Sequence, residues 1–222
     1  MSVESIVNII TSIIVCVATV VSVVIAVIAI KQAKIQMELS NKNNLFSNRV
    51  KGYLIIKGLL NLYNQNKKDI EKGKEDKIYF EVDCLFYGLI NNSYLENMGT
   101  VIEEPLHNPE HKNFLTLLEK LKNEAEKMRF LFENKIGIYA RSFILKYAEV
   151  LMKLYQYKIL IIKMREYSTT YPMVDIKKAA EDMNEIENRK ELFKAFEKLS
   201  EEYKLLNNYD FETKIIEEIK LN

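Results

Sequence analysis

The chain has two histidines, and they lie close together at positions 107 and 111. The run His107-Asn108-Pro109-Glu110-His111 has the letters H-x-x-E-H, a spacing in which two histidines bind zinc and the glutamate activates a water molecule. That chemistry needs both rings on one face of a regular helix. Pro109 interrupts such a helix, because proline lacks the backbone N–H and clashes with the preceding turn. We therefore expect both histidines in a surface loop, with no metal bound.

Other residue patterns typical of enzymes are missing from the sequence. The chain contains no G-x-x-x-x-G-K-[ST], no G-x-G-x-x-G and no G-x-S-x-G run. Neither histidine follows an arginine at the spacing of a HEPN-type ribonuclease. Glu103 and Glu104 form the acidic pair nearest to the histidines, and a solvated turn explains both. We expect a protein that is not an enzyme and uses no cofactor; an enzyme with an unrecognised site is the remaining alternative.

The most informative element is an apolar run from Ile6 to Ile30, whose 25 residues include no charge, proline or glycine. As a helix it would be about 37 Å long, which is enough to cross a hydrocarbon core of about 30 Å. A cleaved signal peptide would need a basic start and a shorter apolar core, and Glu4 is the one charged residue before the run. The sequence therefore predicts an uncleaved transmembrane anchor over residues 1–30.

The basic residues around this run predict its orientation. No lysine or arginine precedes the run, whereas residues 31–68 contain eight basic residues and one acidic residue, Glu38. By the positive-inside rule, the N-terminus lies outside and everything after Ile30 lies in the cytoplasm. We expect this basic neck to face anionic lipid headgroups. Its candidate residues are Lys31, Lys34, Lys42, Arg49 and Lys51.

Residues 69–222 contain 24 basic and 29 acidic residues, so this part of the chain shows no excess of positive charge. Nucleic-acid binders present a basic face, and we therefore expect no nucleic-acid partner. Cys16 lies in the apolar run and Cys84 in a predicted helix, so we expect two free thiols in place of a disulfide.

Small and polar residues gather on one side of the predicted anchor. Ala18, Ser22 and Ala26 follow one another at intervals of four, and Ser12 lies in the same arc of the helical wheel. Such a small-x-x-x-small surface lets two transmembrane helices approach closely. We expect the anchor to self-associate through Ser12, Ala18, Ser22 and Ala26.

The rest of the chain predicts an all-α fold, a single transmembrane helix that continues into a cytoplasmic helical bundle. Six glycines and three prolines are few for a sheet-rich protein. The anchor is expected to continue as a basic amphipathic neck helix over residues 31–66, with a bend near 40–44 and a loop over 64–77. The bundle is expected over 75–222, with helices at 78–90, from about 94, at 109–132, 136–164, 176–206 (capped by Asp175) and 211–219.

The segment from Ile136 to Met164 is apolar enough to consider as a second membrane span. Charged residues interrupt it, among them Arg141, Lys146 and Glu149. Each would cost about 2.5–3.5 kcal/mol near the centre of a bilayer. We therefore expect a central bundle helix with one narrow polar stripe.

One resemblance is carried by the run Leu45-Phe46-x-x-Arg49-x-x-x-Tyr53 directly after the apolar segment. It is similar to a run in a loose group of uncharacterised bacterial single-pass membrane proteins. In that group a basic residue usually precedes the arginine, where this chain has Asn48. The resemblance covers about the first quarter of the chain. It implies the architecture of an N-terminal span followed by a helix, and no activity.

Taken together, these patterns favour a membrane-anchored, non-enzymatic interaction protein that docks an unknown cytoplasmic protein through its bundle and forms oligomers. The alternative is a membrane-perturbing effector of a bacterial anti-phage or toxin system. The polar and small residues between Asn8 and Ser22 favour that alternative, because assembled anchors of this kind can disturb a bilayer.

Overall fold

The structure is a computed structural model that describes residues 2–71, 77–103, 105–107, 109–171 and 173–220. Over these residues the chain is helical, without a strand. The predicted fold class is confirmed: one long apolar helix leads into a helical bundle. The elements are α1 (Val3–Glu71), α2 (Val82–Ile90), the short 3-10 helix η1 (Glu96–Met98), α3 (Thr100–Glu103), α4 (Glu110–Leu131), α5 (Asn134–Thr170), α6 (Ile176–Asp182), α7 (Glu185–Asn208) and α8 (Phe211–Ile219).

The chain divides into two compact units, Met1–Ser47 and Asn48–Asn222, and α1 contributes to both. In the first unit α1 is a lone helix, and its described side chains are exposed except for that of Leu45, which is partly buried. In the second unit the remainder of α1 is a bundle helix whose Ile56, Leu59 and Tyr63 are fully buried. Residues 48–66, which the sequence places in the neck, therefore pack with the bundle.

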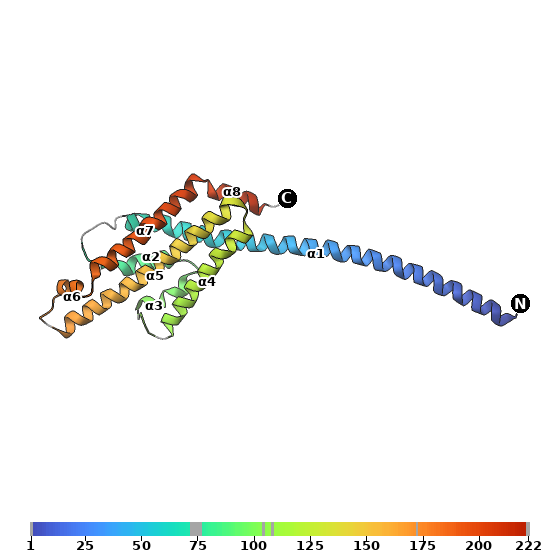
Figure 1. Cartoon of the computed structure of the whole chain (residues 1–222), viewed down its shortest axis with the longest axis horizontal. Coiled ribbons are helices and arrows are strands. Elements are labelled where there is room, and N and C mark those ends of the chain that lie inside the picture. The colour runs from blue at the N-terminus through green and yellow to red at the C-terminus, as the bar shows by residue number, and fades with distance from the viewer. Residues whose placement is uncertain (1, 72–76, 104, 108, 172, 221–222) are drawn as a thin grey trace. The chain divides into compact units, whose positions relative to one another are not determined.

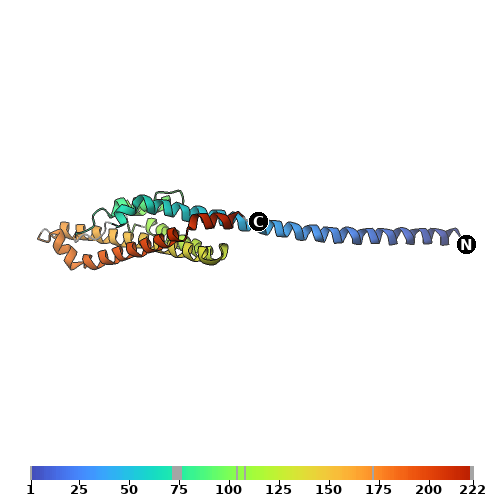
Figure 2. The same ribbon diagram turned by 90° about the horizontal axis from the view of Figure 1, so that it is seen from above.

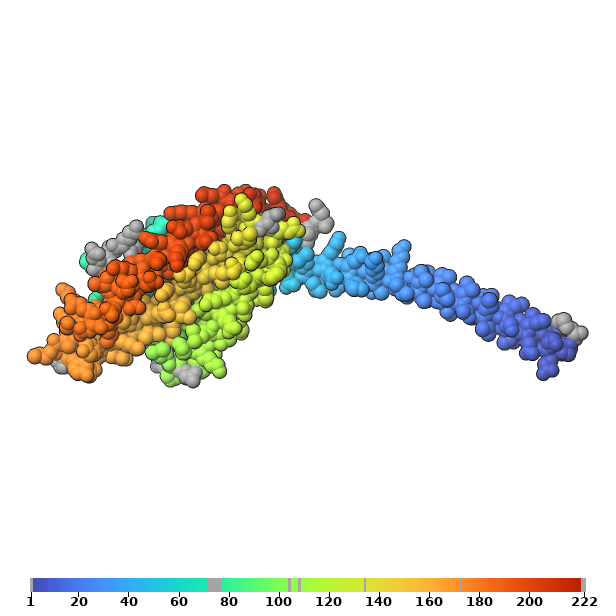
Figure 3. Space-filling model, viewed as in Figure 1, coloured from blue at the N-terminus to red at the C-terminus, as the bar shows by residue number. Residues whose placement is uncertain are grey.

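The core of the bundle is built around α5, which lies between α4 and α7 (Figure 1). Phe143, Tyr147, Leu151 and Leu154 of α5 have no exposed surface. The part of α1 that belongs to the second unit lies along these helices (Figure 2), where Tyr63 contacts the rings of Phe143 and of Tyr203 in α7. In the space-filling view, α4, α5 and α7 cover one face side by side (Figure 3). Burial on nearly all sides explains why α5 is so apolar.

The polar stripe of α5 is a charged seam against α7. The Glu149 carboxylate accepts hydrogen bonds from Lys146 at 2.8 Å and from Lys198 of α7 at 3.2 Å. One turn further, the Lys153 ammonium lies 3.9 Å from a carboxylate oxygen of Glu191 in α7. These ion pairs therefore link α5 to α7, and the charged groups also contact solvent.

The predicted single helix over 176–206 is wrong, because it is interrupted after its first seven residues. α6 ends at Asp182 and α7 begins at Glu185, because Asn184 adopts the left-handed conformation with φ 52°. Asparagine enters that region more readily than most residues. The expected cap at the start of α6 is present, since the Asp175 carboxylate accepts a hydrogen bond from the Lys178 backbone N–H at 2.8 Å.

Several other helix ends differ from the prediction. α1 runs to Glu71, where a loop was expected from residue 64, and it continues without a break through 40–44. The helix expected at 78–90 begins at Val82, and α5 extends to Thr170. The helix expected from about residue 94 is a short 3-10 turn followed by the four residues of α3. By contrast, α8 has the predicted bounds.

Candidate functional site

The most distinctive surface is the apolar part of α1 in the first unit. Its large side chains are exposed along the whole length from Val3 to Ile30. Among the described residues, α1 is the helix long and apolar enough to cross a membrane, and none of its apolar window is buried. Exposed apolar area on this scale is unfavourable in water, and a continuous patch of this kind marks a contact with lipid or protein.

The hydroxyl groups in this segment are satisfied by the helix itself. Thr11 and Ser12 donate to the carbonyl oxygens four residues earlier, at 2.9 and 2.8 Å. Thr19 and Ser22 do the same at 2.8 Å, and Ser22 donates to Ala18. A hydroxyl without a partner is costly in hydrocarbon, so these bonds make the polar residues compatible with an apolar surrounding.

The residues predicted for self-association lie on this exposed helix. Ala18, Ser22 and Ala26 are all exposed and follow one another at successive turns, with Ser12 further toward the N-terminus. Their small side chains leave the backbone accessible from one side. The geometry permits a close helix contact, and the contact itself stays a prediction.

The predicted basic neck divides into three parts. Lys31 and Lys34 are exposed within the first turn after Ile30. Lys42 is exposed on the same continuous helix, but twelve residues of helix place it about 18 Å beyond Ile30. Lys51 is an exposed residue of the bundle unit. Lys31 and Lys34 are thus the residues best placed for a headgroup layer roughly 5–8 Å thick.

Arg49 requires a correction, because it does not face outward. It is only 6% exposed. Its Nε donates to the carbonyl oxygen of Leu131 at 2.6 Å, and its Nη1 donates to that of Glu218 at 2.8 Å. These carbonyls lie in the last turns of α4 and α8, where the helix leaves them without a partner and where the helix dipole is negative. Arg49 therefore joins α1 to two helix ends inside the bundle.

The two histidines contact different residues. Nδ1 of His107 lies 3.1 Å from a carboxylate oxygen of Glu110, and this hydrogen bond lowers the pKa of Glu110. Nδ1 of His111 is hydrogen-bonded to the Tyr155 hydroxyl, and the two rings stack. As expected, α4 begins directly after Pro109, but His111 therefore lies in its first turn and not in a loop. No group of three or more His, Cys, Asp or Glu side chains within the described ranges is placed to hold a metal ion.

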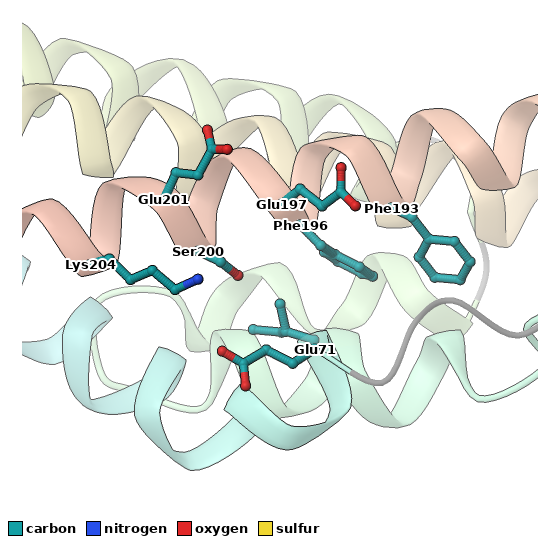
Figure 4. A pocket seen from close by; sticks show the side chains of 8 residues that line it. Glu71, Phe193, Phe196, Glu197, Ser200, Glu201 and Lys204 are labelled. Atoms are coloured by element: carbon teal, nitrogen blue, oxygen red, sulfur yellow. The ribbon is translucent and has the colours of Figure 1, made fainter.

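A groove that the sequence analysis missed lies between the end of α1 and α7 (Figure 4). Its volume is about 460 Å³. Among the described lining residues, Ser200 carries the one hydroxyl, and its oxygen accepts a hydrogen bond from Tyr63 at 2.9 Å. These lining residues include no histidine that could act as a base. The arrangement therefore lacks the parts of a nucleophilic centre. The lining residues are Ile70, Glu71, Phe193, Phe196, Glu197, Ser200, Glu201 and Lys204.

A buried polar cluster holds the segment before α2 against α5 and α7. Glu185 is 1% exposed, accepts a hydrogen bond from the Tyr157 hydroxyl and forms an ion pair with Arg189 at 3.2 Å. The same hydroxyl accepts from the backbone N–H of Tyr79 at 3.0 Å, and Arg189 donates to the carbonyl of Lys77. Burial, and then the bond to Glu185, raises the pKa of Tyr157 far above its ordinary value. The cluster thus stabilises a chain connection.

Comparison of the chain with family models, curated proteins and solved structures finds no match. The exposed apolar segment of α1 and the basic neck that follows it form the candidate site.

Proposed function

We propose that the protein is a membrane-anchored, non-enzymatic interaction protein. Residues 6–30 of α1 cross the bilayer, and the bundle docks a protein partner in the cytoplasm. The observation that carries the proposal is the uninterrupted exposure of the apolar side chains from Val3 to Ile30 on a chain whose bundle has its own buried core. Because the bundle already has a buried core of its own, the bilayer is the apolar environment that can take up this segment.

The distribution of basic residues supports the orientation. Lys31 and Lys34 follow the apolar run at once, and no lysine or arginine precedes it. This asymmetry favours an outside N-terminus and a cytoplasmic bundle. The lipid bilayer is then the first partner, and Ser12, Ala18, Ser22 and Ala26 form the surface proposed for self-association.

Membrane extraction and a reporter fusion test the anchor and its orientation. The full chain should stay with the membrane pellet after washing at high salt and at alkaline pH. Val20→Lys combined with Val24→Lys should move it to the soluble fraction, whereas Asn43→Lys with Asn44→Lys should not. A reporter that fluoresces only in the cytoplasm should be active when fused after Asn222. Release of the unchanged chain by alkaline washing contradicts the anchor. If the cytoplasmic reporter stays dark after Asn222 while a periplasmic reporter at the same position is active, the proposed orientation is wrong.

A membrane-perturbing effector is the second candidate. It is favoured by the polar and small side chains of Asn8, Thr11, Ser12, Thr19 and Ser22 in one apolar segment. Several anchors that gather these residues at their centre would weaken the bilayer barrier. Overproduction should then depolarise the cells, whereas an interaction protein is tolerated. Membrane potential measured with a voltage-sensitive dye separates the two candidates.

A further inference from the structure

α8 packs against the bundle through a short apolar side. Phe211 and Ile215 are buried, whereas Ile216 and Ile219 are only partly buried. The other residues of this nine-residue helix are polar. A helix of this length is not stable on its own in water, because too few turns offset the cost of starting it. α8 is therefore helical because the rest of the bundle holds it.

The hydrogen bonds that join α8 to other elements in the described part of the chain are both made by Glu218, in its last turn. The carbonyl oxygen of Glu218 accepts from Nη1 of Arg49 in α1 at 2.8 Å, and its Oε2 accepts from the backbone N–H of Glu133 at 2.9 Å. Glu133 directly precedes α5, where the positive end of the helix dipole favours a carboxylate. The ion pair between Lys57 and Glu212, at 3.7 Å, contributes little because both side chains are exposed. Glu218 thus pins the far end of α8.

The near end of α8 is joined to α7 through Asp210, which has the left-handed conformation with φ 53° and ψ 48°. That conformation is less favourable than a right-handed one even for aspartate, which enters it more readily than most residues. Tyr209, directly before it, already has right-handed helical angles. A change of Asp210 alone to such angles would therefore extend α7 and move α8 away from the bundle. Hinges of this kind absorb a large movement in very few residues.

The junction between α6 and α7 provides a contrast. Asn184 has almost the same backbone angles, φ 52° and ψ 43°. The next residue, Glu185, is buried and bonded to Tyr157 and Arg189, so this junction is fixed at the hinge itself. The polar bonds of α8 lie roughly two turns beyond its hinge. They hold the helix only while Glu218 stays in place.

We propose that α8 is a strap, which opens about Asp210 while the rest of the bundle stays folded and which Arg49 and Glu218 hold closed. The bundle then has a closed state and an open state, and the open state uncovers the apolar surface beneath Phe211 and Ile215. The strap goes beyond the proposed docking function. It concerns the second unit alone, so it does not depend on whether residues 6–30 cross a membrane.

Arg49 couples the strap to α1. It is the second residue of the second unit, directly after the lone part of α1. The same guanidinium group donates to the carbonyl oxygen of Leu131, at the end of α4, at 2.6 Å. A displacement of Arg49 removes one of the two bonds of Glu218 and favours the open state. Because such coupling is reciprocal, the open state in turn leaves Arg49 with one acceptor and holds α1 less firmly.

Hydrogen–deuterium exchange of the full chain in detergent, measured by mass spectrometry, tests the strap. The amides of α8 should exchange faster than those of α5, because they need only the local opening. Tyr157→Phe weakens a cluster that stays intact when α8 opens, so it should speed exchange in α5 several-fold and leave α8 unchanged. If Tyr157→Phe speeds both helices by the same factor, or if α8 exchanges as slowly as α5, the bundle opens only as a whole and the proposal is wrong.

Substitutions of Glu218 test the pin in the same measurement. Glu218→Ala should speed exchange in α8 several-fold, because the bond to the Glu133 backbone is lost. Glu218→Gln keeps a side-chain oxygen that can accept this bond, and it should recover most of the protection. Glu217→Ala, at an exposed neighbour, is the matched control and should have no effect. Equal exchange in Glu218→Ala and Glu217→Ala refutes the pin.

Substitutions of Asp210 and Arg49 test the hinge and the coupling. Asp210→Ala should speed exchange in α8, because alanine disfavours the left-handed conformation and favours a continuous helix. Asp210→Gly should slow it, because glycine has the opposite preferences. The reverse order, or equal rates, contradicts the hinge. Arg49→Met should speed exchange in α8 several-fold, and Lys51→Met, at an exposed neighbour, should not. Unchanged exchange in Arg49→Met overturns the coupling to α1.

Discussion

The guanidinium group of Arg49 donates a hydrogen bond to the carbonyl oxygen of Glu218, a residue 169 positions further along the chain, at 2.8 Å. A second bond reaches Leu131 at 2.6 Å. The start of the bundle part of α1 is thereby tied to the last turns of α4 and α8.

We expect Arg49→Met to destabilise the bundle by about 1–3 kcal/mol, because two carbonyl oxygens lose a charged donor. Arg49→Lys should recover only part of this loss, since an ammonium group lacks the planar fork that reaches both carbonyls. Lys51→Met, at an exposed neighbour, should change stability by less than about 0.5 kcal/mol. Thermal unfolding of the full chain in detergent, followed by circular dichroism, measures all three. Equal effects of Arg49→Met and Lys51→Met would contradict the buried role.

Gly137 allows α4 and α5 to cross closely. A Cβ atom there would lie 2.6 Å from the carbonyl oxygen of Met128 and 2.7 Å from that of Phe132. Both are backbone atoms, so we expect Gly137→Ala to cost about 1–3 kcal/mol of stability. At Gly58 the nearest atom is the side-chain amide nitrogen of Asn92 at 3.3 Å, which can move. Gly58→Ala should therefore be neutral or stabilising in the same unfolding measurement.

The hydroxyl of Tyr157 bonds two partners, the buried Glu185 and the backbone N–H of the partly buried Tyr79. Removing it with Tyr157→Phe leaves both with one bond fewer, and we expect a loss of about 1–3 kcal/mol. Tyr209→Phe, at a partly buried tyrosine whose ring contacts that of Tyr139 edge to face, should be near neutral. Urea unfolding curves distinguish the two variants. Equal urea midpoints for Tyr157→Phe and Tyr209→Phe would show that the buried cluster contributes nothing measurable to stability.

The charged seam between α5 and α7 should make stability depend on pH. Burial raises the pKa of Glu149, but hydrogen bonds and charges from Lys146 and Lys198 outweigh burial and leave it below the ordinary value of 4.5. A carboxylate with a lowered pKa stabilises the fold above its unfolded pKa, and this stabilisation disappears as the pH falls through the folded pKa. We expect the difference in melting temperature between Glu149→Gln and the unchanged chain to shrink between pH 6 and pH 3. A difference that stays constant over this range argues against the seam.

Bulk on the small face of the apolar segment should interfere with self-association. Ser22→Ile preserves hydrophobicity but places a branched side chain where two backbones would meet. Val24→Leu, at a position outside that face, should have no effect. A bacterial two-hybrid assay with the full chain in the membrane reports both. Unchanged signals for Ser22→Ile indicate that the neck or the bundle holds the copies together.

Much of the helical pattern could be predicted because it depends on local spacing. α8, the start of α4 after Pro109 and the Asp175 cap follow from apolar periodicity and helix-end residues. The break at Asn184 could not, because its left-handed conformation accompanies the burial of Glu185 against Tyr157, a contact between distant segments.

Among the site residues, too, those with local surroundings could be predicted and those with distant contacts could not. Lys31 and Lys34 are exposed as expected, whereas Arg49 looked like one more basic residue of the neck. Its burial is favourable only because Leu131 and Glu218 supply carbonyl oxygens from far along the chain. Its position in the three-four register beside Tyr53 and Ile56 is the signal that could have indicated it. The groove between α1 and α7 gave no such signal, because Glu71 and Ser200 are far apart in sequence.

The bonds of Arg49 also impose an order on biosynthesis. Ribosomes make Arg49 early, while its acceptors at Leu131 and Glu218 follow 82 and 169 residues later. A nascent chain therefore emerges with the apolar side of residues 48–71 of α1 uncovered, and α8 is made after the other described helices. Until then the growing polypeptide exposes surface that a chaperone would recognise. Premature termination before α8 would leave Arg49 without its second acceptor.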